Sequence, residues 1–144
     1  MTVSHILGGK GRKVITLPPS TSIHDAAKFL AENRIGAIII TGANGAIEGI
    51  VSERDIVRSV AGAGNVNLGK PVSDIMTRTV KTCSESDSEE DLMKLMTDNR
   101  IRHLPVVDNG KLVGVVSIGD VVKYRMEAIE SETREMKAYI ASAG

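Results

Sequence analysis

Two stretches of one pattern, Gly49-Ile50-Val51-Ser52-Glu53-Arg54-Asp55 and Gly114-Val115-Val116-Ser117-Ile118-Gly119-Asp120, decide how this chain folds. Each begins with a glycine, continues with two apolar residues and ends with Ser-x-x-Asp. The apolar residues fit the end of a buried strand, and Ser-x-x-Asp is a start signal for a helix. Because the pattern occurs twice, the sequence indicates an internal repeat.

The repeat extends on both sides of these stretches, so that Val14–Arg58 matches Val80–Lys123. An Asn-Arg-Ile triplet at 33–35 recurs at 99–101. Beyond it the match shifts by one residue, at the turn Gly42–Gly45 of the first copy. Turns tolerate such changes of length, so the alignment breaks where a repeat can absorb it.

Each copy predicts the same order of elements, β-α-β-β-α. In the first copy, strands are expected over Val14–Leu17, Ala37–Ile40 and Ile47–Val51, with helices that begin at Ser22 and after Ser52. In the second copy, strands are expected over Val80–Cys83, Leu104–Val107 and Leu112–Val116, with helices that begin at Ser88 and after Ser117. An Asn-Gly pair joins the last two strands of each copy, which is typical of a hairpin.

A single unit of this kind leaves one face of its sheet uncovered. We therefore expect an α/β (α+β) fold in which two β-α-β-β-α repeats pack sheet to sheet as one pseudo-two-fold domain. The predicted boundaries are an N-terminal segment 1–13, a first repeat 14–70, a second repeat with its linker 71–124, and a C-terminal helix 125–144. Two independent small domains are the alternative, although each would be marginal in size.

The composition argues against several classes of function. Lys plus Arg and Asp plus Glu number 18 each, whereas a nucleic-acid binder needs a basic surface. Trp is absent and there is one Phe, so stacking platforms for single strands are scarce. No apolar run approaches the roughly 20 residues of a membrane helix, and the single Cys83 fits a reducing compartment. We expect a cytoplasmic protein with no nucleic-acid and no membrane partner.

The joint order of these motifs resembles the CBS domain pair, or Bateman module. Arg100–Asp108 is similar to the second strand of that family, and Val72–Thr77 to the segment before a repeat. The resemblance covers roughly Val14–Lys123 and includes no attached enzyme, channel or transporter domain, which indicates a stand-alone pair. It implies a regulatory module that binds an adenine nucleotide in the clefts between the repeats. AMP, ADP and ATP are the expected ligands, with NAD(H) or S-adenosylmethionine as further members of the class.

The same resemblance implies which residues hold the ligand. One site would combine Ser117 and Asp120 with Thr16 and Gly36-Ala37-Ile38, and the other would combine Ser52 and Asp55 with Thr82, His103 and Pro105. Arg102 and His103 match positions near phosphates in the family. From the residues themselves, Arg54 at a helix start suits a phosphate, whereas its counterpart is Gly119. The two sites are therefore expected to be unequal.

Plainer interpretations stand beside these. Ser-x-x-Asp is also a helix-capping signature, and capping by the Ser is compatible with ligand contact by the Asp. Arg54 fits a solvated surface charge, and His103 fits a packed histidine. A module that serves only protein interaction, with non-functional clefts, is the alternative function.

Catalysis has little support in the residues. His5, His24 and His103 lack metal-ligand spacing, and no nucleophile motif occurs, so we expect no enzyme and no metal. Cys83 is expected in the core. Gly8–Gly11 lacks the spacing of a phosphate-binding loop and is expected to be a mobile loop.

The C-terminal stretch carries an apolar stripe. Its members, separated by alternating steps of four and three, are Val122, Met126, Ile129, Thr133, Met136 and Ile140. This period is typical of helices that pair along a seam. The stripe fits packing on the protein's own core or on a second copy. We expect a homodimer, together with a downstream protein partner that the sequence does not identify.

Overall fold

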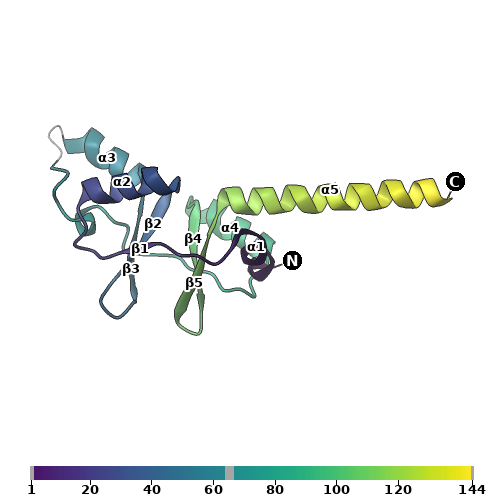
Figure 1. Cartoon of the computed structure of the whole chain (residues 1–144), viewed down its shortest axis with the longest axis horizontal. Coiled ribbons are helices and arrows are strands. Elements are labelled where there is room, and N and C mark those ends of the chain that lie inside the picture. Colours follow the sequence, from purple (N-terminus) through teal and green to yellow (C-terminus); the bar gives the residue numbers. More distant parts are fainter. Residues whose placement is uncertain (1, 64–66, 144) are drawn as a thin grey trace. The chain divides into compact units, whose positions relative to one another are not determined.

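The computed structural model describes residues 2–63 and 67–143 (Figure 1). In chain order the elements are α1 (Val3–Lys10), β1 (Thr16–Leu17), α2 (Ile23–Asn33), β2 (Ala37–Thr41), β3 (Ile47–Ser52), α3 (Glu53–Ala63), the short 3-10 helix η1 (Val72–Asp74), α4 (Glu89–Asn99), β4 (His103–Asp108), β5 (Lys111–Ser117) and α5 (Ile118–Ala143). The order β-α-β-β-α therefore occurs in the first copy as predicted. Residues 1, 64–66 and 144, which the predicted boundaries include, lie outside the described residues.

Contacts within the chain define two compact units. We call 13–82 with 109–112 the repeat-1 unit, and 1–12, 83–108 and 113–144 the repeat-2 unit. Each unit is described by itself. The N-terminal helix α1 belongs to the repeat-2 unit, and the segment that contains η1 belongs to the repeat-1 unit.

The repeat-1 unit is built on a three-stranded sheet in the order β1-β2-β3. Thr16 of β1 pairs in parallel with Ile39 of β2, and Ala37 of β2 pairs in antiparallel fashion with Ser52 of β3. The core joins one face of α2 to β2, β3 and the η1 segment through Ile23, Ala26, Leu30, Ile38, Ile40, Val51, Val72 and Met76. The strand β1 is shorter than the predicted Val14–Leu17.

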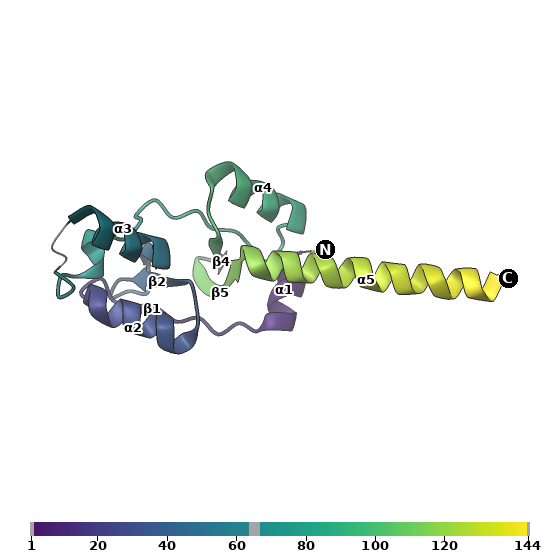
Figure 2. The same cartoon turned by 90° about the horizontal axis from the view of Figure 1, so that it is seen from above.

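The repeat-2 unit contains a two-stranded sheet, β4-β5. Its core consists of Val3, Ile6, Leu7, Cys83, Leu92, Met96, Leu104, Val106, Val116 and Val121. Both α1 and α4 contact α5, and Figure 2 shows the start of α5 between them. Cys83 therefore lies in the core, as predicted.

The predicted first strand of the second copy, Val80–Cys83, is reduced to one parallel bridge between Cys83 and Val106. Cys83 donates its N–H to the Pro105 carbonyl at 3.0 Å, and Val107 donates to the Cys83 carbonyl at 2.8 Å. The next bridge of a parallel ladder would need an N–H at Pro105, which proline lacks. In the first copy, Ile39 occupies the equivalent position, and the ladder is one pair longer.

The hairpin turns form at the predicted Asn-Gly pairs. Asn109 and Gly110 have φ values of 50° and 74°, which suit the two-residue turn between β4 and β5. In the first copy, Gly45 has a φ of 76°, and the longer turn is accompanied by a register shift between Ile40 and Thr41. The one-residue difference between the copies is therefore confined to this turn.

The expectation of a mobile loop at Gly8–Gly11 is wrong, because Gly8 to Lys10 form the last turn of α1. The apolar residues Val3, Ile6 and Leu7 follow helical spacing and are buried in the repeat-2 core. Backbone bonds from Val3 N to the Asp87 carbonyl at 2.9 Å and from Ser4 N to the Glu85 carbonyl at 3.0 Å fix the start of α1. The N-terminal segment is thus part of a folded core.

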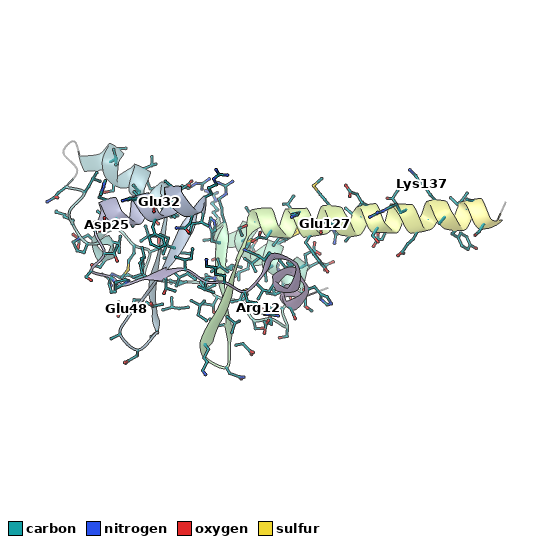
Figure 3. All side chains as sticks on the ribbon, viewed as in Figure 1. Arg12, Asp25, Glu32, Glu48, Glu127 and Lys137 are labelled. Carbon is teal, nitrogen blue, oxygen red and sulfur yellow. The ribbon has the colours of Figure 1, made fainter. Side chains whose placement is uncertain are left out.

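Helix α5 continues without interruption through the predicted boundary at 125. Its apolar stripe does not pack on the described chain, since Met126, Ile129 and Ile140 are 57%, 51% and 63% exposed. In Figure 3, the side chains of Glu127 and Lys137 extend from α5 beyond the rest of its unit. Among the described residues, no helix is both long and apolar enough to cross a membrane.

Candidate functional site

In the repeat-1 unit, β3 runs directly into α3 at the first Ser-x-x-Asp. The Asp55 Oδ2 atom accepts a hydrogen bond from the Ser52 N–H at 2.8 Å and from the Ser52 hydroxyl at 3.1 Å. In return, the Asp55 N–H donates to Ser52 Oγ at 3.3 Å. This reciprocal arrangement is a capping box, so the capping interpretation of the motif is confirmed here.

The repeat-2 unit builds the same cap where β5 runs into α5. The Ser117 N–H donates to Asp120 Oδ2 at 2.8 Å, and the Asp120 N–H donates to Ser117 Oγ at 3.1 Å. In the described part of the chain, all recorded hydrogen bonds to the Asp55 and Asp120 carboxylates go to Oδ2. Each Oδ1 atom is left for a further donor, so capping does not use up the carboxylate.

The start of each hairpin lies beside its own Ser-x-x-Asp. The Glu53 N–H donates to the Gly36 carbonyl at 3.0 Å, and the Ile118 N–H donates to the Arg102 carbonyl at 2.8 Å. Ala37 is the ladder partner of Ser52. Each unit thus brings one strand start and one helix start together. The predicted combination of residues from different repeats stays a prediction.

The predicted site residues differ in how far their side chains reach solvent. Thr16, Arg54, Thr82 and Arg102 are exposed, and Gly36, Ala37, Ser52, Asp55, His103, Ser117 and Asp120 are partly exposed. Ile38 and Pro105 are buried. Ile38 is 1% exposed and packs in the repeat-1 core, so its side chain is not available to a ligand.

A lysine that the sequence did not suggest joins the second Ser-x-x-Asp. Lys10, the last residue of α1, places its Nζ atom 2.6 Å from Asp120 Oδ2 and 2.8 Å from the Val115 carbonyl oxygen. The described residues place no such ammonium on Asp55. A basic residue at the end of a short apolar stretch with helical spacing is the sequence signal for such a lysine. The glycines beside Lys10 instead favour a loop, so the signal was not recognised.

The surroundings of Asp120 act on its acidity in two directions. Partial burial raises the pKa of its carboxyl group. The hydrogen bonds from Lys10 and Ser117, together with the positive charge of Lys10, lower this pKa by more than burial raises it. The net result is a pKa below the ordinary value of 3.8. The carboxylate is therefore charged at neutral pH and able to accept hydrogen bonds.

Cys83 is not a reactive group of this site. Burial, and then the nearby negative charge of Asp87, raise the pKa of its thiol to about 12. The thiol donates toward the Pro105 carbonyl at 3.8 Å. A protonated, buried thiol is a poor nucleophile, in agreement with the predicted core role.

The glycine that opens each motif makes room for a neighbouring segment. A Cβ at Gly49 would lie 2.6 Å from Met76 Sδ and 2.9 Å from the Thr77 carbonyl oxygen. A Cβ at Gly114 would lie 2.8 Å from Leu7 Cδ2. Each repeat thus uses its glycine to bring a covering segment against its last strand.

Comparison with known proteins identifies the family. The model of the CBS domain matches residues 4–62 and 72–127, which together make up most of the chain. The chain belongs to the CBS domain family, as a protein with two CBS repeats. The chain spans between 66% and 71% of the length of three curated relatives.

Three solved structures show how similar the fold is. The CBS-domain-containing protein ATU1752 from Agrobacterium tumefaciens is 46% identical, with a TM-score of 0.84 over 87% of this chain and 99% of that one. Protein PAE2072 from Pyrobaculum aerophilum, solved in complex with AMP, is 34% identical, with a TM-score of 0.75 over 83% and 89%. The CBS domain pair of protein MJ0100, solved with 5′-methylthioadenosine and S-adenosyl-L-methionine, is 29% identical, with a TM-score of 0.79 over 89% and 98%.

Proposed function

We propose that this chain is a sensor module that binds an adenine nucleotide and performs no catalysis of its own. The observation that carries the proposal is the pair of Asp carboxylates, Asp55 and Asp120, each held at a helix start with its Oδ1 atom left for a ligand. PAE2072 with AMP and MJ0100 with two adenosine compounds support the ligand class.

The chemistry of these positions suits a nucleoside. A carboxylate accepts hydrogen bonds from the two ribose hydroxyls, the role that an acidic residue has in dinucleotide-binding folds. The first turns of α3 and α5 begin at the same places, and helix N-termini favour phosphate oxygens. The carbonyls of Gly36 and Arg102, the residues directly before β2 and β4, lie beside these helix starts.

The two sites are proposed to differ in how they hold phosphates. Arg54 is exposed in the first turn of α3 and offers a guanidinium, whereas Gly119 offers no side chain at the equivalent place in α5. Arg102 and His103 are proposed phosphate contacts as well. The proposal retains the pairing of Ser52 and Asp55 with Thr82, His103 and Pro105, and of Ser117 and Asp120 with Thr16 and Gly36-Ala37-Ile38.

Thermal unfolding with AMP, ADP, ATP, NADH and 5′-methylthioadenosine, compared with GTP and CTP, tests the ligand class. A ligand at a hundredfold excess over its Kd stabilises the native state by about 2.7 kcal/mol. For a domain near this size, that corresponds to a rise in Tm of several degrees. Adenine compounds should raise the Tm and be recovered chemically unchanged. A Tm that no adenine compound moves would contradict the proposal.

We further propose a homodimer, formed along α5, as the route by which the module acts on other proteins. Its exposed stripe of Val122, Met126, Ile129, Met136 and Ile140 lies on one seam. An open groove on the first half of α5, lined in part by Met126 and Lys123, continues this surface. The stripe of a second copy of α5 has the same spacing, and a closed two-fold pair of helices would bury both stripes. If the clefts bind nothing, dimerisation would be the function that remains.

A further inference from the structure

We infer that Lys10 makes the Asp120 site selective for adenosine ligands that carry a phosphate. This inference rests on the proposed function and adds the charge class of the ligand at one of its sites. It starts from the contact between the Lys10 ammonium and Asp120 Oδ2 at 2.6 Å.

The ammonium is held in place by folded structure. Lys10 ends α1, whose residues Val3, Ile6 and Leu7 are between 0% and 3% exposed in the repeat-2 core. The Val115 carbonyl, two residues before the Ser-x-x-Asp segment, accepts a second hydrogen bond from Lys10 at 2.8 Å. An ammonium has three donors, so one N–H of Lys10 is left for a ligand.

A second cation of the same segment is engaged elsewhere. Arg12 pairs with Glu85, on the segment before α4. Gly119, the counterpart of Arg54, offers no charge. Lys10 therefore supplies to the second Ser-x-x-Asp the kind of positive charge that Arg54 is proposed to supply to the first, but from a different part of the chain.

The chemistry of a nucleotide explains the selectivity. Ribose hydroxyls that bind Asp120 Oδ1 leave Oδ2 with Lys10 and Ser117. The 5′-phosphate is attached to the same ribose, within the reach of the flexible lysine side chain. An ammonium there favours a phosphate, which carries about 1.5 to 2 negative charges at pH 7. It gives no such advantage to uncharged 5′-methylthioadenosine, and it repels the sulfonium of S-adenosylmethionine.

Calorimetric titration of three ligands against two proteins tests the inference. The ligands are AMP, 5′-methylthioadenosine and S-adenosylmethionine, and the proteins are Asp55→Ala, which isolates the Asp120 site, and Asp55→Ala with Lys10→Met. Methionine keeps an apolar stem of similar length. We expect AMP affinity to fall roughly tenfold, the lower end of the range for a hydrogen bond to a charged group. The affinity for 5′-methylthioadenosine should stay unchanged, and that for S-adenosylmethionine should stay or rise.

Two further variants make the result specific. Lys10→Arg should retain most of the AMP affinity, because the positive charge is kept. Lys94→Met removes an exposed lysine of α4 and should change nothing. Equal losses for AMP and 5′-methylthioadenosine, or an AMP affinity that stays or rises in Lys10→Met, would overturn the role of Lys10 while the proposed function stands. A wild-type protein that binds none of the three would overturn both.

Discussion

At the level of single residues, Asp55 and Asp120 each cap a helix and are each proposed to bind the ligand, and substitution can separate these two roles. Asp55→Ala and Asp120→Ala should each weaken one ligand site by about 1.5–3 kcal/mol, the range for hydrogen bonds to a charged group. The loss of a carboxylate from a first helical turn should cost only about 0.3–1 kcal/mol of stability. Isothermal titration and urea unfolding of the same samples measure the two effects.

Asp25→Ala is the matched control for these variants. Asp25 stands in an equivalent place at the start of α2, where its N–H donates to Ser22 Oγ at 3.0 Å, but it belongs to neither proposed site. It should lose no affinity, and no more stability than the other two variants, because the alanine keeps the backbone N–H that donates to Ser22. If Asp55→Ala and Asp120→Ala bind like Asp25→Ala, both carboxylates are caps and nothing more.

The raised pKa of the Cys83 thiol predicts that the stability of the protein depends on pH. Its pKa is about 12 in the folded protein, against an ordinary value of 9.0, so the folded state holds the proton more tightly than the unfolded chain does. The resulting stabilisation is complete below about pH 9 and is lost as the pH rises toward about 12. Urea unfolding at about pH 8 and about pH 10.5 should show a larger fall for wild type than for Cys83→Ala, in which this group is absent. Parallel curves for the two proteins would contradict the assignment.

At the scale of elements, alanine substitutions of the glycines in β3 and β5 should destabilise the protein to different degrees. Gly49→Ala would press on the Thr77 backbone, which cannot move easily, and should cost about 1–3 kcal/mol of stability. Gly114→Ala meets only the Leu7 side chain and should cost less. Gly62→Ala, which meets no atom within 4 Å in α3, should stabilise by about 0.5–1 kcal/mol. Denaturant unfolding of the three variants gives the order, and a Gly114→Ala protein less stable than Gly49→Ala would refute it.

The elements also show what the sequence could and could not predict. Hairpins and capped helices followed from local signals, because Asn-Gly turns and Ser-x-x-Asp act over a few residues. The second copy forms one parallel bridge fewer than the first because Pro105 has no N–H to donate to the opposite strand, which is distant in the sequence. Helix α1 was missed, because Gly8 and Gly9 have poor helix propensity and the burial of Leu7 against the second repeat is a tertiary effect. Lys10 was missed for the same reason: its partner, Asp120, is far away in the chain.

At the scale of the whole molecule, the exposed stripe of α5 predicts the oligomeric state. Light scattering should give about twice the 15.3 kDa mass of the chain. Ile129→Glu would place a charge in the seam and should give monomers, whereas Ser131→Glu places the same charge on the opposite face of α5 and should leave the dimer intact. A wild-type protein that is monomeric at micromolar concentration would exclude the pairing.

The placement of α1 has a consequence for the order in which the protein is made. Its residues are translated before both repeats, yet the core that they complete includes Val116 and Val121 of the second repeat. The segment with Val72 and Met76, by contrast, closes the repeat-1 core soon after that repeat is synthesised. During translation the first half can therefore mature while the N-terminal residues, Lys10 among them, still wait for the second half to emerge. A ligand at Asp120 would accordingly meet its site only after the second repeat has been synthesised.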